Sequence, residues 1–225
     1  MHFTCLDTMS KKAIILLSGG LDSATVLGIA VCSGFSCFCI SFDYGQRHRI
    51  ELDFAKKIVD RSANVVEHKI LRLDPEGFKG SALTGMCEVP KGRNPSNLGN
   101  DIPSTYVPMR NTIFISYALG YAECVGASHV FIGCNAVDYS NYPDCRPRYI
   151  EYFQKLADIA TGCKIRIDAP LINMSKSEII KLGVGLGVDY TITFSCYDPL
   201  DSGLPCGDCD SCMLRRQGFE SIGLM

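Results

Sequence analysis

The chain has 225 residues, of which 47% are hydrophobic and 20% charged, a composition typical of a soluble globular protein. Lysine and arginine number 22 against 24 acidic residues, and this net charge of −2 gives no general reason to expect a nucleic-acid partner, although it does not exclude a local basic patch. No apolar run reaches about 18 residues, and residues 1–12 lack the layout of a signal peptide, so neither a membrane span nor export is indicated.

Short apolar runs alternate with helical patterns along the chain. The expected order is a strand at 13–17, a helix at 23–34, a strand at 35–42, a helix at 47–63, a strand at 64–71, a helix at 110–127, a strand at 129–134, a helix at 148–162, a strand at 165–171 and a helix at 175–187. This alternation predicts an α/β fold with a doubly wound parallel sheet. Right-handed crossovers then place every strand-to-helix loop on the same rim.

Two segments interrupt the alternation. Residues 72–109 contain no convincing helix or strand, and a loop of this length in a compact domain is more often functional than idle. Residues 195–212 form a cysteine cluster. The chain holds 13 cysteines without an export signal, which predicts reduced thiols in a cytoplasmic protein. Five lie in apolar stretches and are expected to be buried as small hydrophobic side chains: Cys32, Cys37, Cys39, Cys124 and Cys134.

The first strand runs into a glycine-rich turn, LLSGGLDSATVL at 16–27. Gly19 and Gly20 let the backbone approach a ligand, and the helix that follows offers free N–H groups and the positive end of its dipole. Together these features predict a phosphate site, with Ser18 and Ser23 as hydroxyl donors and Asp22 as a helix cap or a magnesium ligand. The alternative is a plain tight turn capped by Asp22.

The sequence SGGLDS resembles the SGGxDS signature of the pyrophosphate-loop ATP enzymes, which release pyrophosphate and leave AMP on an acyl or equivalent oxygen. The resemblance implies a nucleotide-binding domain at 11–190 with the adenine-nucleotide alpha-hydrolase-like strand order 3-2-1-4-5. The ligand crevice is then expected where the order reverses, between the first and fourth strands. The resemblance also implies a set of ATP-binding residues: Leu17, Ser18, Gly19, Gly20, Leu21, Asp22, Ser23, Ala24, Thr25, Val26 and Leu27.

Three further polar stretches, FDYGQRHRIE (42–51), VPMRN (107–111) and NAVDYSNYPDCR (135–146), fall on the predicted rim. Each alone is explained equally well as a solvated loop, but together they indicate a pocket. FDYGQRH, VPMRN and YPDCR resemble the family of 7-cyano-7-deazaguanine synthases, from Lys12 to about Gln217. The candidate substrate-binding residues are Tyr44, Gln46, Arg47, Asn111, Asp138, Tyr142, Asp144 and Arg146.

The cysteine cluster has the spacing C-x9-C-x2-C-x2-C, formed by Cys196, Cys206, Cys209 and Cys212. Four thiolates at such spacing suit tetrahedral zinc, and an all-cysteine site without an open position is structural. The alternative is four unligated thiols or a disulfide pair. The family resemblance also implies zinc, one ion per chain, in a C-terminal segment at 191–225 packed on the nucleotide-binding domain.

The resemblance implies a nitrile-forming reaction of queuosine biosynthesis. With ATP and magnesium, 7-carboxy-7-deazaguanine is adenylated and attacked by ammonia; the resulting amide is adenylated in turn and loses AMP. The candidate catalytic residues are Asp22, Arg110, Lys176 and His48. His48 is a proton carrier or a structural histidine, and Lys176 contacts phosphate or is merely exposed. SKSEI at 175–179 has the layout of a capping box.

The expected partners are the small-molecule acid and free ammonia, without nucleic acid or membrane; the oligomeric state is open, with a homodimer as one candidate. One rival is a tRNA-modifying pyrophosphate-loop enzyme of the thiolase or lysidine-synthetase type, which would need a basic face. Another is a non-enzymatic zinc module that binds nucleic acid through residues 195–216. That second rival leaves SGGLDS unexplained.

Overall fold

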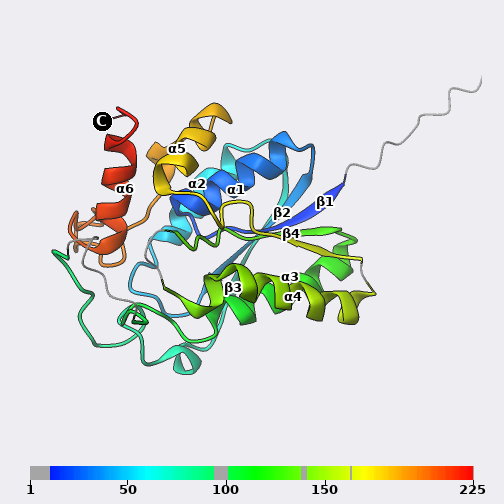
Figure 1. The fold of residues 1–225 in the computed structure, drawn as a ribbon, viewed down its shortest axis with the longest axis horizontal. Coiled ribbons are helices and arrows are strands. Elements are labelled where there is room, and N and C mark those ends of the chain that lie inside the picture. The colour runs from blue at the N-terminus through cyan, green and yellow to red at the C-terminus, as the bar shows by residue number, and fades with distance from the viewer. Residues whose placement is uncertain (1–10, 94–100, 138–140, 163, 225) are drawn as a thin grey trace, which may run out of the picture.

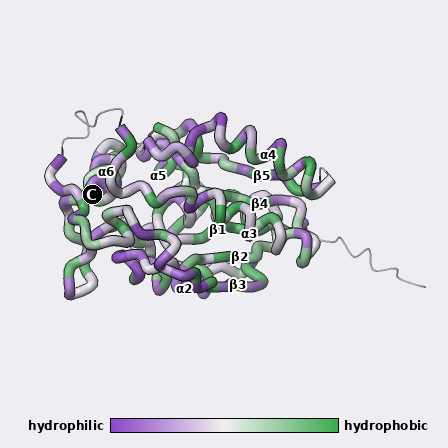
Figure 2. Tube along the Cα trace, turned by 90° about the horizontal axis from the view of Figure 1, so that it is seen from below, coloured by the Kyte–Doolittle hydropathy of each residue, from purple (hydrophilic) through white to green (hydrophobic). Residues whose placement is uncertain are grey.

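The computed structural model describes residues 11–93, 101–137, 141–162 and 164–224. In these ranges five strands form one parallel sheet in the order β3-β2-β1-β4-β5. The strands are β1 (Lys12–Leu16), β2 (Ser36–Asp43), β3 (Val65–Arg72), β4 (His129–Phe131) and β5 (Arg166–Asp168). The predicted fold class and strand order are therefore confirmed. Figure 2 shows the strands side by side in this order.

Helices cover both faces of the sheet (Figure 1). One face carries α1 (Leu21–Cys32), α2 (Glu51–Asp60) and α5 (Lys176–Gly185), and the other carries α3 (Arg110–Val125) and α4 (Pro147–Thr161). The last helix, α6 (Asp210–Glu220), packs against α5 at the end of the sheet where the strands terminate. Short 3-10 helices span Pro75–Phe78, Pro143–Cys145 and Tyr190–Ile192.

The apolar sequence of β1 follows from its position at the centre of the sheet. Ile14 and Leu16 belong to the core cluster that includes residues of α3 and α4. Ala13 and Ile15 belong to the cluster that includes residues of α1, α2 and α5. A strand buried on both faces has no solvent-facing positions, which is why its residues are hydrophobic without alternation.

Several element boundaries differ from the predictions. β4 and β5 are shorter than the apolar runs at 129–134 and 165–171, because apolar residues continue into the core after strand pairing has ended. Two residues after β5, Pro170 lacks the N–H group that a strand ladder uses. α2 begins at Glu51, since residues 47–50 form a turn. α6 was not predicted from the sequence.

The described parts of the long segment between β3 and α3, residues 73–93 and 101–109, contribute to the core. They place Phe78, Leu83, Val89 and Val107 in the same core cluster as α3. Lys91 forms an isolated antiparallel bridge with Cys209, which joins this segment to the cysteine-rich part of the chain. The segment therefore forms part of the wall above the carboxyl ends of the strands (Figure 1).

The expectation that five cysteines are buried is partly wrong. Cys37, Cys39 and Cys134 are buried, whereas Cys32 and Cys124 are exposed. Cys32 is the last residue of α1 and Cys124 lies in the last turn of α3, where the helix turns these positions away from the core. Within the described ranges, no helix combines the length and apolarity that crossing a bilayer would require.

Candidate functional site

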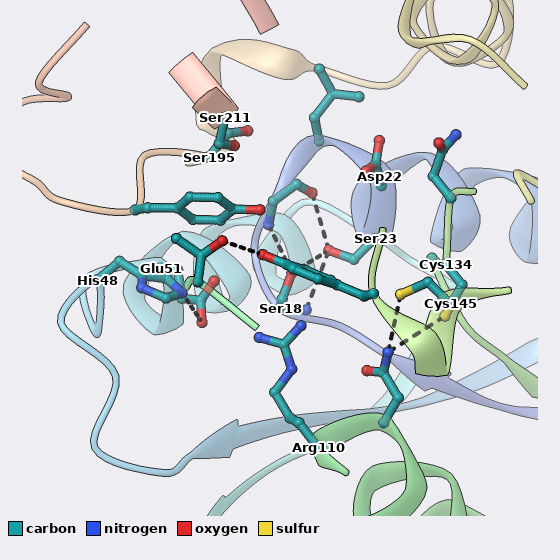
Figure 3. A pocket seen from close by; sticks show the side chains of 18 of the residues that line it. Ser18, Asp22, Ser23, His48, Glu51, Arg110, Cys134, Cys145, Ser195 and Ser211 are labelled. Atoms are coloured by element: carbon teal, nitrogen blue, oxygen red, sulfur yellow. Dashed lines mark hydrogen bonds and ion pairs between the residues drawn. The ribbon is translucent and has the colours of Figure 1, made fainter. Parts of the chain in front are cut away.

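A cavity of about 520 Å³ opens at the carboxyl ends of β1, β2 and β4. Leu17, Ser41 and Gly133 line it from these three strand ends. Further walls come from residues 101–105 of the long segment and from the C-terminal part of the chain, including Ser195 and Ser211 (Figure 3). The cavity thus lies where the strand order reverses, as predicted.

The serines of the glycine-rich turn are held by hydrogen bonds within the turn. The Ser18 backbone N–H donates to Ser23 Oγ at 3.2 Å, and Ser23 Oγ donates to the Gly20 carbonyl at 3.0 Å. Gly20 is the N-cap of α1, and no side chain in the described part of the chain caps this helix start. Asp22 is therefore not the cap, and N–H groups of the first turn remain available to an anionic ligand.

Gly19 is the closest point of contact between this turn and α2. Its φ is +95°, and a Cβ atom added there would lie 2.1 Å from the Glu51 carbonyl oxygen and 2.8 Å from the Ala55 nitrogen. Both obstacles are backbone atoms, which cannot rotate away. The Gly19 carbonyl also accepts a hydrogen bond from the Phe194 N–H at 2.9 Å. Conformation and space therefore both require glycine here.

Asp22 and Lys176 form an ion pair at the edge of the cavity. Lys176 Nζ donates to both carboxylate oxygens of Asp22, at 2.7 and 2.9 Å. The predicted capping box is confirmed: Ser175 and Glu178 bond reciprocally and begin α5 immediately before Lys176. Lys176 is therefore not merely exposed: its side chain is 15% exposed and lines the cavity beside the start of α1.

Arg110 enters the cavity from the first turn of α3. The preceding residue, Met109, adopts a left-handed conformation with φ of 57°. Arg110 Nη1 donates to the Tyr44 hydroxyl at 3.0 Å. Burial raises the pKa of Tyr44 to about 12, so the phenol stays neutral and the guanidinium keeps its positive charge. The cavity wall therefore carries a fixed positive charge at this point.

His48 and Glu51 form a buried polar pair beside Arg110. His48 Nε2 lies 3.5 Å from Glu51 Oε1, and Gln46 Nε2 donates to the same oxygen at 3.1 Å. Burial lowers the pKa of His48 to about 3, an effect to which Arg110 adds. Burial raises the pKa of Glu51 to about 8. Both side chains are therefore predominantly neutral at pH 7, and their contact is not a charged pair.

The predicted substrate-binding residues divide into three groups. Tyr44, Asn111 and Tyr142 line the cavity. Gln46 and Asp144 are buried outside the lining, where they fix backbone: Gln46 Oε1 accepts from the Tyr44 N–H, and Asp144 Oδ2 accepts from the Asn111 N–H.

The third group lies away from the cavity lining. Arg47 binds the Gly85 and Cys87 carbonyls and Asp198, and Arg146 is the exposed residue before α4. Asp138 falls outside the described residues. Sequence order placed all of these side chains on the rim, but it did not distinguish the cavity side of each loop from its outer side.

Several predicted ATP-binding residues also lie behind the cavity rather than in its wall. Leu17, Ser18, Gly20, Leu21, Asp22 and Ser23 line it. The later residues of the range, Ala24, Thr25, Val26 and Leu27, are buried in α1. Thr25 Oγ1, for example, is 2.7 Å from the Tyr190 hydroxyl and donates to the Leu21 carbonyl.

The cysteine cluster is assembled in space. The sulfur atoms of Cys196, Cys206, Cys209 and Cys212 all lie within 4.8 Å of one another. Backbone N–H groups point at the sulfurs: Cys206 N donates to Cys196 Sγ at 3.2 Å, and Cys209 N donates to Cys206 Sγ at 3.3 Å. Four converging sulfurs with N–H donors fit a tetrahedral metal such as zinc, because such donors stabilise thiolates.

Sequence reasoning missed the cavity residues contributed by the C-terminal segment. These include Ser195, Tyr197, Asp210, Ser211 and Arg215. Arg93 and Glu51 were missed as well. The length of the 72–109 loop, which suggests function, was a signal that residues such as Arg93 contribute to the site. For the C-terminal segment, the cysteine spacing was explained by metal binding, and the residues between and after the cysteines were therefore not considered as cavity residues.

Comparison with known proteins agrees with this geometry. The model of the family described as "Queuosine biosynthesis protein QueC" matches residues 12–223. The 7-cyano-7-deazaguanine synthase of Desulfatibacillum aliphaticivorans is 53% identical over 220 residues, covering 95% of this chain and 94% of the relative. That of Pseudomonas fluorescens (strain SBW25) is 54% identical over 220 residues, covering 95% and 96%.

Among solved structures, NMN synthetase from Francisella tularensis superposes with a TM-score of 0.51 at 21% identity, covering 98% of this chain and 81% of that one. This likeness shows a shared fold. The family model and the relatives each span nearly the whole chain. The chain therefore belongs to the 7-cyano-7-deazaguanine synthase family.

Proposed function

We propose that this enzyme converts 7-carboxy-7-deazaguanine and ammonia into 7-cyano-7-deazaguanine, at the expense of ATP, in queuosine biosynthesis. The observation that carries the proposal is that one cavity joins the SGGLDS turn to polar side chains from the loops after β2 and β4. A nucleotide and a second small molecule can therefore meet there. The names of the relatives identify the second molecule as a deazapurine.

Forming a nitrile from a carboxylate requires the removal of two oxygen atoms, each a poor leaving group. Adenylation of the acid makes AMP the leaving group, and ammonia then displaces it to give the amide. A second adenylation, on the amide oxygen, followed by loss of AMP and of the two N–H protons, gives the nitrile. Ammonia is the nucleophile in this scheme, so no cysteine of the protein has to attack the substrate.

The residues of the turn fit the binding of a departing pyrophosphate. Ser18, Ser23 and the uncapped start of α1 offer hydrogen-bond donors where negative charge develops. The oxygen ligands of Asp22 suit magnesium, which would supply further positive charge to the phosphates. Magnesium binding by Asp22 would release Lys176 toward the phosphate groups. Arg110 adds a cation on the opposite side of the cavity.

His48 remains a candidate proton carrier. Its Nδ1 has no hydrogen-bond partner among the described residues, and the side chain lines the cavity. The lowered pKa keeps the imidazole neutral, so it can accept a proton but holds it weakly. A histidine that only packs in the core would leave the rate of nitrile formation unchanged when replaced by Asn, once the loss of stability is corrected for.

We also propose that the cysteine cluster holds one structural zinc ion. Residues 191–225 would then form a zinc-binding segment on the nucleotide-binding domain at 11–190. Three of the cluster's sulfur-bearing residues, Cys196, Cys209 and Cys212, already belong to the core cluster that contains the sheet, which supports a structural role. The remaining proposals are a cytoplasmic location, free ammonia as the nitrogen donor, and no nucleic-acid partner.

The test is mass analysis of the products from 7-carboxy-7-deazaguanine, ammonium and magnesium-ATP. We expect the nitrile, with AMP and pyrophosphate, and we expect Asp22→Asn to abolish turnover while the protein remains folded. ADP and orthophosphate as products would refute the proposed chemistry. Accumulation of the amide would limit the activity to the first half of the scheme, and pyrophosphate release that depends on tRNA would favour the tRNA-modifying rival.

A further inference from the structure

The C-terminal helix α6 brings a basic side chain, Arg215, into the wall of the cavity. The helix starts at Asp210, directly after Cys209, and contains Cys212. Arg215 therefore follows the last cysteine of the cluster by less than one turn. The last cysteine of the cluster, Cys212, and this arginine therefore lie on one helix.

In the described part of the chain, the Arg215 guanidinium donates hydrogen bonds to neutral acceptors and lies over the Phe219 ring. Nη1 donates to Thr193 Oγ1 at 2.8 Å and to Ser195 Oγ at 3.2 Å, and Nη2 donates to the Tyr190 carbonyl at 2.7 Å. Within the described ranges, no carboxylate oxygen lies within 4 Å of it. Burial lowers the pKa of Arg215, although Cys212, Tyr190 and Asp22 act in the opposite direction.

A half-buried cation without a carboxylate in contact is unfavourable, because its desolvation is only partly offset by more distant negative charges. The neutral acceptors orient the guanidinium without neutralising it. An arginine also has five N–H donors, so hydrogen-bonding capacity remains for a ligand. These features are those of a side chain held ready for an anion.

The segment that holds Arg215 lies against the glycine-rich turn. The Phe194 N–H donates to the Gly19 carbonyl at 2.9 Å, and a Cβ atom added at Gly20 would lie 3.5 Å from the Phe194 carbonyl oxygen. Thr193 and Ser195, the side-chain acceptors of Arg215, flank Phe194. The arginine is thus attached to the part of the chain that adjoins the turn.

The same helix supports Lys176. A Cβ atom added at Gly218 would lie 2.7 Å from Lys176 Cγ, so α6 packs closely against the stem of the lysine. Arg215 and Lys176 consequently line one cavity from neighbouring helices, α6 and α5. Lys176 contacts Asp22 at the start of α1, and the charge of Asp22 also acts on Arg215.

We infer that Arg215 is a phosphate-binding residue that acts with Lys176 on the phosphate groups of ATP and on the pyrophosphate released. The planar guanidinium matches phosphate oxygens in a two-pronged geometry that lysine cannot reproduce. The cysteine cluster then contributes to nucleotide binding by fixing the start of α6. The inference rests on the proposed function only in that a nucleotide binds at the glycine-rich turn.

The test compares Arg215→Gln and Arg215→Lys with Arg216→Gln as the matched control. Arg216 is the next residue of the same helix, is exposed, and donates a hydrogen bond to the Gly207 carbonyl at 3.4 Å. Dissociation constants for magnesium-ATP and magnesium-pyrophosphate are measured by calorimetry. We expect Arg215→Gln to weaken both by about 10- to 100-fold, the range typical of a hydrogen bond to a charged group. Arg215→Lys should fall between, and Arg216→Gln should bind as the wild type does.

Zinc content and the midpoint of thermal unfolding without ligand are recorded for every variant. If Arg215 only ties α6 to residues 190–195, the variants will unfold at lower temperature but keep wild-type dissociation constants, and the inference fails. Should Arg215→Gln not fold, Arg215→Lys decides in the same way. If the wild type forms the nitrile and the Arg215 variants bind magnesium-ATP and magnesium-pyrophosphate as tightly as it does, the inference fails and the proposed function stands. If the Arg215 variants bind pyrophosphate more weakly but the wild type forms no nitrile, the proposed function fails and the inference stands.

Discussion

Replacing Glu51 by Gln probes the buried polar pair beside the cavity. The Glu51 side chain is 11% exposed, accepts a hydrogen bond from Gln46 and faces His48. The charged and titratable groups around it are His48, Arg110 and Tyr44. Burial raises its pKa from 4.5 to about 8, against the opposing effects of Gln46 and Arg110. The folded protein therefore favours the neutral carboxyl group.

The sign of the effect follows from linkage. Because the pKa of Glu51 is higher in the folded state, its contribution to stability is fully present below pH 4.5 and is lost as the pH rises through 8. One pKa unit corresponds to about 1.4 kcal/mol, so the loss amounts to a few kcal/mol. Gln has the same shape, stays neutral at every pH and still offers an oxygen to Gln46. The variant should thus lose much less stability at high pH.

The assay is urea unfolding followed by circular dichroism at several pH values between 5 and 9. We expect Glu51→Gln to match the wild type near pH 5 and to exceed it above pH 8. His48 contributes stability above pH 6.5 that is lost as the pH falls through 3, so its contribution varies at the acid end of this range, whereas that of Glu51 is lost at the alkaline end. Glu88→Gln, at an exposed position, is the control and should leave the pH dependence unchanged. Parallel curves for Glu51→Gln and the wild type would refute the reasoning.

Two further substitutions test packing and metal binding. Gly183→Ala would place a Cβ atom 1.8 Å from the Tyr190 hydroxyl oxygen, and the clash should lower the free energy of unfolding by about 1–3 kcal/mol in urea. Gly185→Ala, on the same helix with no atom within 4 Å of the added Cβ, should not destabilise; equal effects at the two positions would contradict the packing argument. Cys209→Ser should lose the bound zinc, measured by atomic absorption, and lower the unfolding midpoint, whereas exposed Cys87→Ser should retain both. A Cys209→Ser protein that keeps one zinc per chain would rule out the four-cysteine site.

The sheet could be predicted because its central strands are apolar throughout and are separated by helical periods. β1 and β2 are buried along nearly their whole length, and Gly34 follows the end of the first helix. α6 could not be predicted in the same way, because its polar positions and Gly218 weaken the helical pattern. Gly218 makes sense only from the structure, where a larger residue would collide with Lys176 and Ile180.

The site was predictable in outline because parallel strands end on one rim, which brings Ser18, Tyr44 and Arg110 together. The direction in which each loop side chain points was not predictable. Arg47 and His48 are adjacent in sequence, yet Arg47 binds carbonyls outside the cavity and His48 is buried in its wall. That difference depends on how residues 44–50 turn against α2, which the spacing of polar residues does not encode.

The contact of Gly19 with the backbone of α2 has a consequence for protein engineering. Residues 44–50, which precede α2, would be the natural target for changing which base the enzyme accepts. An insertion or deletion there that displaced the start of α2 by one ångström would press directly on the turn that is proposed to bind ATP. There is no spare room at this contact, because even a Cβ atom added to Gly19 would lie only 2.1 Å from the Glu51 carbonyl oxygen. Such a variant would change its substrate preference and bind the nucleotide more weakly at the same time. Libraries that randomise side chains in this loop while keeping its length avoid that penalty.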